Sequence, residues 1–412
     1  MHLECVPCTC EIHEGAGPGG EIIQASVAEA AETLLERYAG QVQTLYMDPP
    51  FYSNQQYVLK LGVGESGWRT GKPATQLPAY DDRWADPGQY LRMMRGAFEL
   101  AHALLKPEGA FFVHIDARMN ARFRLMLDEI FGEGNFVNEI IWVYQTGGRS
   151  KRYFSRKHDT ILFFQKSGAL YFNIEAVSIS RKSRHNHMKR AADADGRTYR
   201  CIRVGGKEYR YYDDAPAYPS DVWEDVSHLQ QKDPQRSGFD SQKPIALLER
   251  VIGCSSRPGD LVCDLFAGSG TTAVAAAGQG RRFLGVDASD AAILTMRKRL
   301  LDRGWALQAP TGQGSPVLDV QIRPSVGYCE VFLMSFEIEA GLCPHSSEAL
   351  SHVDQWSIGY VRDGRFHGYA HAARSKAAPA LPARLEMPIL AGDPAVLTVD
   401  ILGRRLVHRI WE

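Results

Sequence analysis

The stretch Val42-Gln43-Thr44-Leu45-Tyr46-Met47-Asp48-Pro49-Pro50-Phe51 decides the fold. Its mostly apolar, β-forming run ends at Asp-Pro-Pro, because proline lacks the N–H that a ladder needs and restricts the residue before it. We therefore predict a buried strand over 42–47 whose carboxyl end carries a carboxylate, a stiff backbone and an aromatic ring. Ligands of open α/β sheets bind at this end of the strands. By itself, the stretch favours a plain strand followed by a rigid turn.

The features after this strand suit methylation of an exocyclic amine on a nucleobase. The lone pair of such an amine is delocalised into the ring and must be localised toward a methyl donor. The Asp48 carboxylate and the Pro49 carbonyl can each accept an N–H from the amine, and the Phe51 ring can stack on a base that has left the helix.

A second motif lies far downstream, in Leu261-Val262-Cys263-Asp264-Leu265-Phe266-Ala267-Gly268-Ser269-Gly270-Thr271-Thr272. It predicts a strand, a glycine turn and the start of an Ala-rich helix. Gly268 and Gly270 let the backbone approach a ligand, and the helix N-terminus supplies free N–H groups. Asp287 follows 19 residues after Gly268, at the end of the next predicted strand. That spacing suits hydrogen bonds to ribose hydroxyls.

Together with Gln242-Lys243-Pro244, these motifs make residues 20–305 resemble the permuted beta class of DNA amino-methyltransferases, in which the catalytic motif precedes the S-adenosylmethionine motif. Residues 132–142 and 154–162 are similar to the modification subunits of type III restriction systems and to their solitary relatives. The resemblance implies an α/β fold with a Rossmann-like S-adenosylmethionine-dependent methyltransferase sheet in permuted motif order. An inserted basic target-recognition region and a small C-terminal β-rich domain complete this expected architecture.

The resemblance also implies roles for individual residues. The catalytic motif is Asp48, Pro49, Pro50 and Phe51. The expected contacts to the methyl donor are Lys243 near its methionine carboxylate, Asp264 at its ammonium, Thr271 or Thr272 at its carboxylate and Asp287 at its ribose, with Phe266 packing against it and Gly268 and Gly270 forming the turn. Where the family usually has Gly-Asp, this chain has Ala25-Ser26, and Ser26 is expected to cap a helix instead.

Residues 147–210 contain 16 Lys and Arg against 5 Asp and Glu, although the whole chain has a net charge of −1. Aromatic residues are interleaved with these charges, a composition typical of nucleic-acid binding, since cations neutralise phosphates and aromatic rings stack on bases. A solvated basic face is the alternative. We expect phosphate contacts in the densest cluster, which contains Arg181, Lys182, Arg184, Lys189 and Arg190.

The pattern along the chain predicts four parts. These are a catalytic half over 1–146, the target-recognition insertion over 147–219, a donor-binding half over 220–309 and a β-rich accessory domain over 317–412, after a Gly- and Pro-rich linker at 310–316. Residues 52–88 show no sustained period and predict a long loop that can close over a flipped base. Two hairpins are predicted in the tail, about Asp363-Gly364 and about Gly403.

Composition sets the outer bounds. No run of 18 apolar residues exists, and eight scattered cysteines favour free thiols in a reducing cytoplasm. Cys5, Cys8, Cys10 and His13 are zinc-ligand types, but their spacing is cramped, and reduced thiols in a short strand are the favoured interpretation.

The expected function is methylation of the N6 amine of adenine in duplex DNA, with S-adenosylmethionine as cofactor, no metal and no covalent enzyme intermediate. The alternatives are an N4-cytosine DNA methyltransferase, an inactive DNA-binding module, and a methyltransferase for RNA or protein. A homodimer and a restriction subunit are open as partners.

Overall fold

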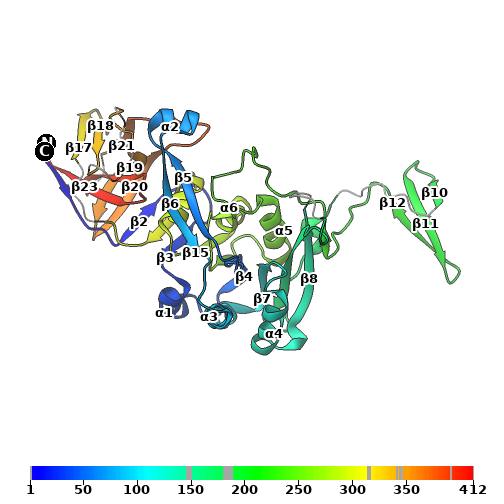
Figure 1. Cartoon of the computed structure of the whole chain (residues 1–412). Helices are drawn as coiled ribbons and strands as arrows, with labels where there is room; N and C mark the ends of the chain where they lie inside the picture. The colour runs from blue at the N-terminus through cyan, green and yellow to red at the C-terminus, as the bar shows by residue number, and fades with distance from the viewer. Residues whose placement is uncertain are drawn as a thin grey trace.

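The structure is a computed structural model that describes residues 2–144, 151–179, 189–312, 317–339, 342, 346, 348–389 and 392–411. Parallel strands form the centre of its largest sheet (Figure 1). In spatial order they are β16 (Trp305–Gln308), β3 (Gly20–Gln24), β15 (Arg282–Asp287), β14 (Leu261–Asp264), β4 (Val42–Met47) and β7 (Leu105–Ile115). The predicted strand over 42–47 is confirmed, and all six of its residues are buried. Burial on both faces explains its nearly unbroken apolar run.

Helices cover both faces of this parallel core. One face packs against α1 (Val27–Tyr38), α3 (Pro87–Leu104) and α4 (Asn120–Phe131), and the other against α5 (Ile245–Ser255), α6 (Thr271–Gly278) and α7 (Asp290–Arg299). Leu45 of β4 points into the first layer and its neighbour Tyr46 into the second, as the period of two in a strand requires. The predicted methyltransferase-type α/β sheet is therefore present.

The sheet continues beyond β7 through β9 (His158–Gln165), β8 (Phe136–Val143) and the short β13 (Val222–Trp223). The first two pairings are antiparallel, and β13 returns parallel to β8. Two 3₁₀ turns flank this part, Glu133–Asn135 and Ile174–Val177.

The prediction of a long loop over 52–88 is wrong. These residues form a hairpin of β5 (Gln56–Gly62) and β6 (Ala74–Asp81), with α2 (Gly64–Thr70) inserted between the strands. A register shift between Tyr57 and Val58, opposite Pro78, breaks the apolar alternation that would have indicated strands.

The C-terminal strands extend the same sheet. From β16 outward the order is β2 (Cys10–His13), β20 (Arg365–Ala373), β19 (Val353–Arg362), β22 (Asp393–Asp400), β23 (Arg405–Trp411) and β1 (His2–Cys5). Both predicted hairpins are confirmed as β19–β20 and β22–β23. A separate sheet of β17 (Val317–Pro324), β18 (Tyr328–Glu337) and β21 (Arg384–Pro388) packs against them. The N-terminal β2 pairs with both β16 and β20 and so joins the C-terminal strands to the parallel strands. The division of the chain into four parts stays a prediction.

The basic insertion forms a small sheet of its own. It consists of β10 (Lys189–Ala192), β11 (Thr198–Val204) and β12 (Lys207–Tyr212). Figure 1 shows it at one end of the molecule, away from the large sheet. Within the described part of the chain, the helices are too short or too polar to span a bilayer.

Candidate active site at the carboxyl ends of the strands

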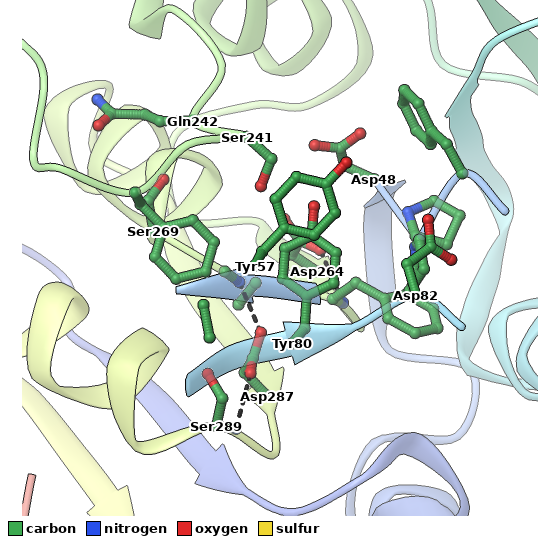
Figure 2. Close-up of a pocket in the computed structure, with 18 of the residues that line it drawn as sticks. Asp48, Tyr57, Tyr80, Asp82, Ser241, Gln242, Asp264, Ser269, Asp287 and Ser289 are labelled. Atoms are coloured by element: carbon green, nitrogen blue, oxygen red, sulfur yellow. Dashed lines mark hydrogen bonds between the residues drawn. The ribbon is translucent and has the colours of Figure 1, made fainter. Parts of the chain in front are cut away.

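The two motifs that are far apart in sequence meet at one edge of the sheet. β4 and β14 are parallel neighbours, with Asp264 opposite Tyr46. Phe51 and Gly268 consequently line the same cavity, which has a volume of about 910 Å³. Figure 2 shows Asp48, Asp264 and Asp287 around this space.

Asp48 lines the cavity directly after the carboxyl end of β4. Its Oδ2 forms an ion pair with the Nζ of Lys243, and the two side chains are only 16% and 12% exposed. Its Oδ1 is buried and has no hydrogen-bond partner among the described residues. Lys243 Nζ also lies 5.2 Å from the centre of the Phe51 ring. An acceptor atom is therefore available beside an aromatic face.

The backbone of the Asp-Pro-Pro-Phe motif is held by neighbouring side chains. The hydroxyl of Tyr90 donates to the Pro50 carbonyl at 2.5 Å. Asp82 accepts from the backbone N–H groups of Tyr52 at 3.1 Å and Ser53 at 2.6 Å. Asp82 thus anchors the segment after the motif. Pro49 and Pro50 both line the cavity.

The glycine turn has the geometry that requires glycine. Gly268 and Gly270 adopt φ values of +49° and +73°, and a Cβ on Gly270 would lie 2.5 Å from the Cγ of Met296. The Gly268 N–H donates to Asp287 Oδ2 at 2.8 Å, and the Ser289 N–H donates to Asp287 Oδ1 at 2.9 Å. The acid therefore fixes the turn while it lines the cavity.

Asp264 is a buried carboxyl inside this turn. It accepts from the Phe266 N–H at 3.0 Å and from the Thr272 hydroxyl at 2.5 Å. Burial, followed by the nearby charges of Asp48 and Asp287, raises the pKa of Asp264 to about 7. Burial also raises the pKa of Asp287. A cation placed beside Asp264 would stabilise its ionised form.

Lys243 and Thr271, which are predicted to contact the methyl donor, contact other parts of the chain in this structure. The ammonium of Lys243 contacts Asp48, whereas its backbone carbonyl accepts from the Thr271 hydroxyl at 3.3 Å. Thr271 in turn accepts from Arg299 at 2.9 Å, and Arg299 also donates to the Ser269 carbonyl at 2.8 Å. Sequence reasoning missed Arg299, because it lies in the last turn of α7 beyond any recognised motif.

The β5–β6 hairpin supplies an aromatic wall that sequence reasoning also missed. Tyr57 and Tyr80 stack with ring centres 4.5 Å apart, and Tyr80 lies 6.3 Å from the Phe239 ring. The C-terminal region holds this hairpin in place, since Glu348 accepts from the Glu65 N–H at 2.7 Å. The sequence signal that could have indicated this wall is the presence of tyrosines at positions 57 and 80.

A buried polar chain forms the wall behind Phe51. His114 Nδ1 forms a hydrogen bond with the Tyr46 hydroxyl at 2.9 Å, and its Nε2 lies 3.2 Å from Asp159 Oδ2. Asp159 also accepts from the Tyr144 hydroxyl at 3.1 Å. The Phe51 and His114 rings are stacked at 5.8 Å. Both ring nitrogens of the buried His114 therefore have hydrogen-bond partners.

The predicted DNA contacts are only partly described. Arg181, Lys182 and Arg184 lie outside the described residues. Lys189 and Arg190 are exposed on β10, and Arg190 donates to Asp213 at 3.1 Å.

The N-terminal cysteines and His13 do not converge. Cys5, Cys8 and Cys10 carry free thiols, while His13 stacks on Trp305 at 4.2 Å. Among the described residues, no group of three metal-ligating side chains comes together. Ser26 does cap α1, in a reciprocal pair with Glu29, as predicted.

Comparison with known proteins places this geometry in a family. The chain is 25% identical over 306 residues to the type II methyltransferase M.EcaI of Enterobacter cloacae, covering 63% of this chain and 64% of that protein. It is 28% identical to the DNA adenine methyltransferase YhdJ of Escherichia coli (48% and 63% covered) and 24% identical to the StyLTI Mod subunit of Salmonella typhimurium (58% and 47% covered). The chain thus spans less than two thirds of each of these relatives. The DNA methylase model matches residues 42–298, more than half of the chain, and this protein therefore belongs to the N6/N4 DNA methylase family.

Proposed function

We propose that this protein transfers a methyl group from S-adenosylmethionine to the N6 amine of adenine in duplex DNA. The observation that carries the proposal is the shared cavity, which is lined by Asp48 with its unpartnered Oδ1, by Phe51 and by the glycine turn. One end of the cavity can hold a cationic nucleoside, and the other presents a hydrogen-bond acceptor and a stacking face.

The residues at the glycine turn fit S-adenosylmethionine. Asp264 is buried at a raised pKa and gains from a neighbouring ammonium, while Asp287 retains acceptor capacity for ribose hydroxyls beside the turn. The partly buried Phe266 lines the cavity as an apolar surface, and Thr271 and Thr272 begin α6, whose N-terminus favours a carboxylate. When bound, S-adenosylmethionine supplies an electrophilic methyl group on its sulfonium.

At the other end, the residues of the chain orient the amine. Asp48 Oδ1 accepts one amine N–H and the Pro49 carbonyl accepts the other, which directs the nitrogen lone pair toward the donor end. The Asp48 charge stabilises the positive charge that develops on nitrogen as it forms its new bond. Phe51 stacks on the extruded base, and the hairpin aromatics Tyr57 and Tyr80 exclude water from the cavity.

Adenine is favoured over cytosine for two reasons. The family resemblance associates an Asp at position 48 with adenine, since cytosine members more often carry Ser there. The relative YhdJ is named a DNA adenine methyltransferase. N4 of cytosine is the second candidate, because the matched family includes both chemistries. The basic, aromatic-rich insertion favours duplex DNA over RNA or protein, and a homodimer and a restriction subunit are further proposed partners.

The test is modification mapping of DNA from cells that carry the gene or its Asp48→Ala form. We expect N6-methyladenine at one sequence motif with the native gene and its loss with the variant. N4-methylcytosine at that motif would reject the adenine assignment. Isothermal titration of the purified protein with S-adenosylmethionine tests the inactive-module alternative, because an inactive module that binds no donor would show no heat.

A further inference from the structure

Two buried polar atoms in the cavity lack hydrogen-bond partners among the described residues. One is Asp48 Oδ1 and the other is Nδ1 of His228. Apart from these two, no described side chain that lines the cavity has a buried polar atom without a hydrogen-bond partner. Because an unsatisfied buried polar atom is costly, two such atoms on side chains that line one cavity favour a ligand that supplies both hydrogen bonds.

His228 is connected to the catalytic motif through a continuous series of ring contacts. Phe51 stacks on His114 at 5.8 Å, His114 meets the Trp142 ring edge-on at 5.6 Å, and Trp142 stacks on His228 at 6.1 Å. Tyr144 adds a second ring 5.7 Å from His228. The imidazole therefore stands on the same aromatic wall as the proposed base-stacking face.

The backbone around His228 is fixed as well. The indole N–H of Trp142 donates to the Val226 carbonyl at 2.8 Å, two residues before His228. Burial, followed by the charges of Arg236 and Lys243, lowers the pKa of His228, although the Leu229 backbone and Asp159 act in the opposite direction. A lowered pKa favours the neutral ring, which carries one N–H donor.

We propose that His228 helps to recognise the target base by donating a hydrogen bond from Nδ1 to a ring nitrogen next to the reacting amine. In adenine the N6 amine is flanked by N1 and N7, both acceptors. Asp48 then accepts an N–H from the N6 amine, and His228 donates its N–H to the ring nitrogen next to that amine. A base with a keto group at the same position offers no N–H to Asp48 and is rejected. This inference rests on the proposed adenine methylation.

The experiment uses the full chain and duplexes that contain its mapped target. The target adenine is replaced by 7-deazaadenine in one duplex and by 1-deazaadenine in another, and kcat/KM is measured for the wild type, His228→Ala and His228→Gln. His352→Ala is the matched control, because His352 lies in the C-terminal region and does not line the cavity.

On adenine, we expect His228→Ala to lower kcat/KM by about 10- to 100-fold with unchanged donor affinity, and His228→Gln to recover part of it. One of the two deaza duplexes should lower the wild-type value by a similar factor and cause no further loss in His228→Ala. The duplex that responds identifies the nitrogen.

Two results would overturn the inference: equal activity of His228→Ala and wild type on adenine, or the same loss by His228→Ala on all three duplexes, which indicates a purely structural role. Failure of the proposed function would look different, because the wild type itself would then methylate no adenine.

Discussion

Replacing Asp48 by Asn tests the centre of the mechanism with a nearly isosteric change. The amide retains one acceptor oxygen but loses the negative charge. It also leaves the ammonium of Lys243, which pairs with Asp48 Oδ2, without its anionic partner. That uncompensated cation would lie beside the nitrogen on which positive charge develops during methyl transfer.

The magnitude follows from the burial of the pair. Two unit charges about 4 Å apart at an effective dielectric constant of about 20 interact by roughly 4 kcal/mol. A hydrogen bond to a charged group contributes about 1.5–3 kcal/mol, and part of this is included in the Coulomb figure. A loss of about 3–4 kcal/mol in the transition state corresponds to a decrease in kcat of roughly 10²- to 10³-fold.

The assay is single-turnover transfer of a radiolabelled methyl group to the mapped target, together with titration of the donor. Donor affinity should stay within about threefold, since the glycine turn is untouched. Asp81→Asn is the matched control, because Asp81 lies at the rim of the same cavity, 45% exposed and paired with Arg83. Full turnover by Asp48→Asn would refute the role assigned to this carboxylate.

Three further changes test the donor end of the cavity. Lys243→Met removes the cation that pairs with Asp48 and should tighten binding of DNA with an unpaired target base by about 3- to 10-fold, measured by fluorescence anisotropy. A tenfold loss of affinity for S-adenosylmethionine would instead locate the lysine at the methionine carboxylate of the methyl donor. Wild-type donor affinity, measured by titration calorimetry, should fall as the pH drops below about 7, where Asp264 becomes protonated, and Asp264→Asn should bind weakly at every pH. In the free protein a raised carboxyl pKa means that stability declines as the pH rises from about 4 to 7, so Asp264→Asn should remove that slope from thermal melts. Gly270→Ala should lower the Tm by several degrees, because backbone strain at φ +73° adds to a clash of the new Cβ 2.5 Å from the Met296 side chain. Gly280→Ala is the control: its φ is the same and its Cβ would meet open space, so the Tm should fall only by the contribution of backbone strain.

The sequence predicts the core of this fold because its local signals and its burial agree. All six residues of the run over 42–47 are buried, and four of them are apolar. The two polar residues, Gln43 and Thr44, form hydrogen bonds with Ser255. The turn signals at Gly268 and at Asp363-Gly364 are equally local, since positive φ values are needed there. The shared cavity was predictable because carboxyl ends of neighbouring parallel strands meet at one edge.

The missed features depend on contacts between segments far apart in the chain. The β5–β6 hairpin is stabilised by Glu348, which accepts a hydrogen bond from the Glu65 N–H. These two residues are 283 positions apart in the sequence. Lys243 reaches Asp48 across 195 residues, and nothing near either residue indicates the pairing. Local patterns cannot reveal such partners, and bulges such as the one at Val58 remove the periodicity that would have indicated the strands.

The order of the two motifs along the chain matters less than the order of their strands in the sheet. Asp48 follows β4 and Asp264 ends β14, and these strands are hydrogen-bonded neighbours, so the two carboxyls interact electrostatically however the chain connects them. A negative Asp48 raises the pKa of Asp264 and disfavours a second buried charge. In the proposed reaction, a cationic methyl donor beside Asp264 relieves that repulsion. Parallel pairing of β4 with β14 thus brings the carboxyl proposed to bind the methyl donor and the carboxyl proposed to bind the amine into one electrostatic environment.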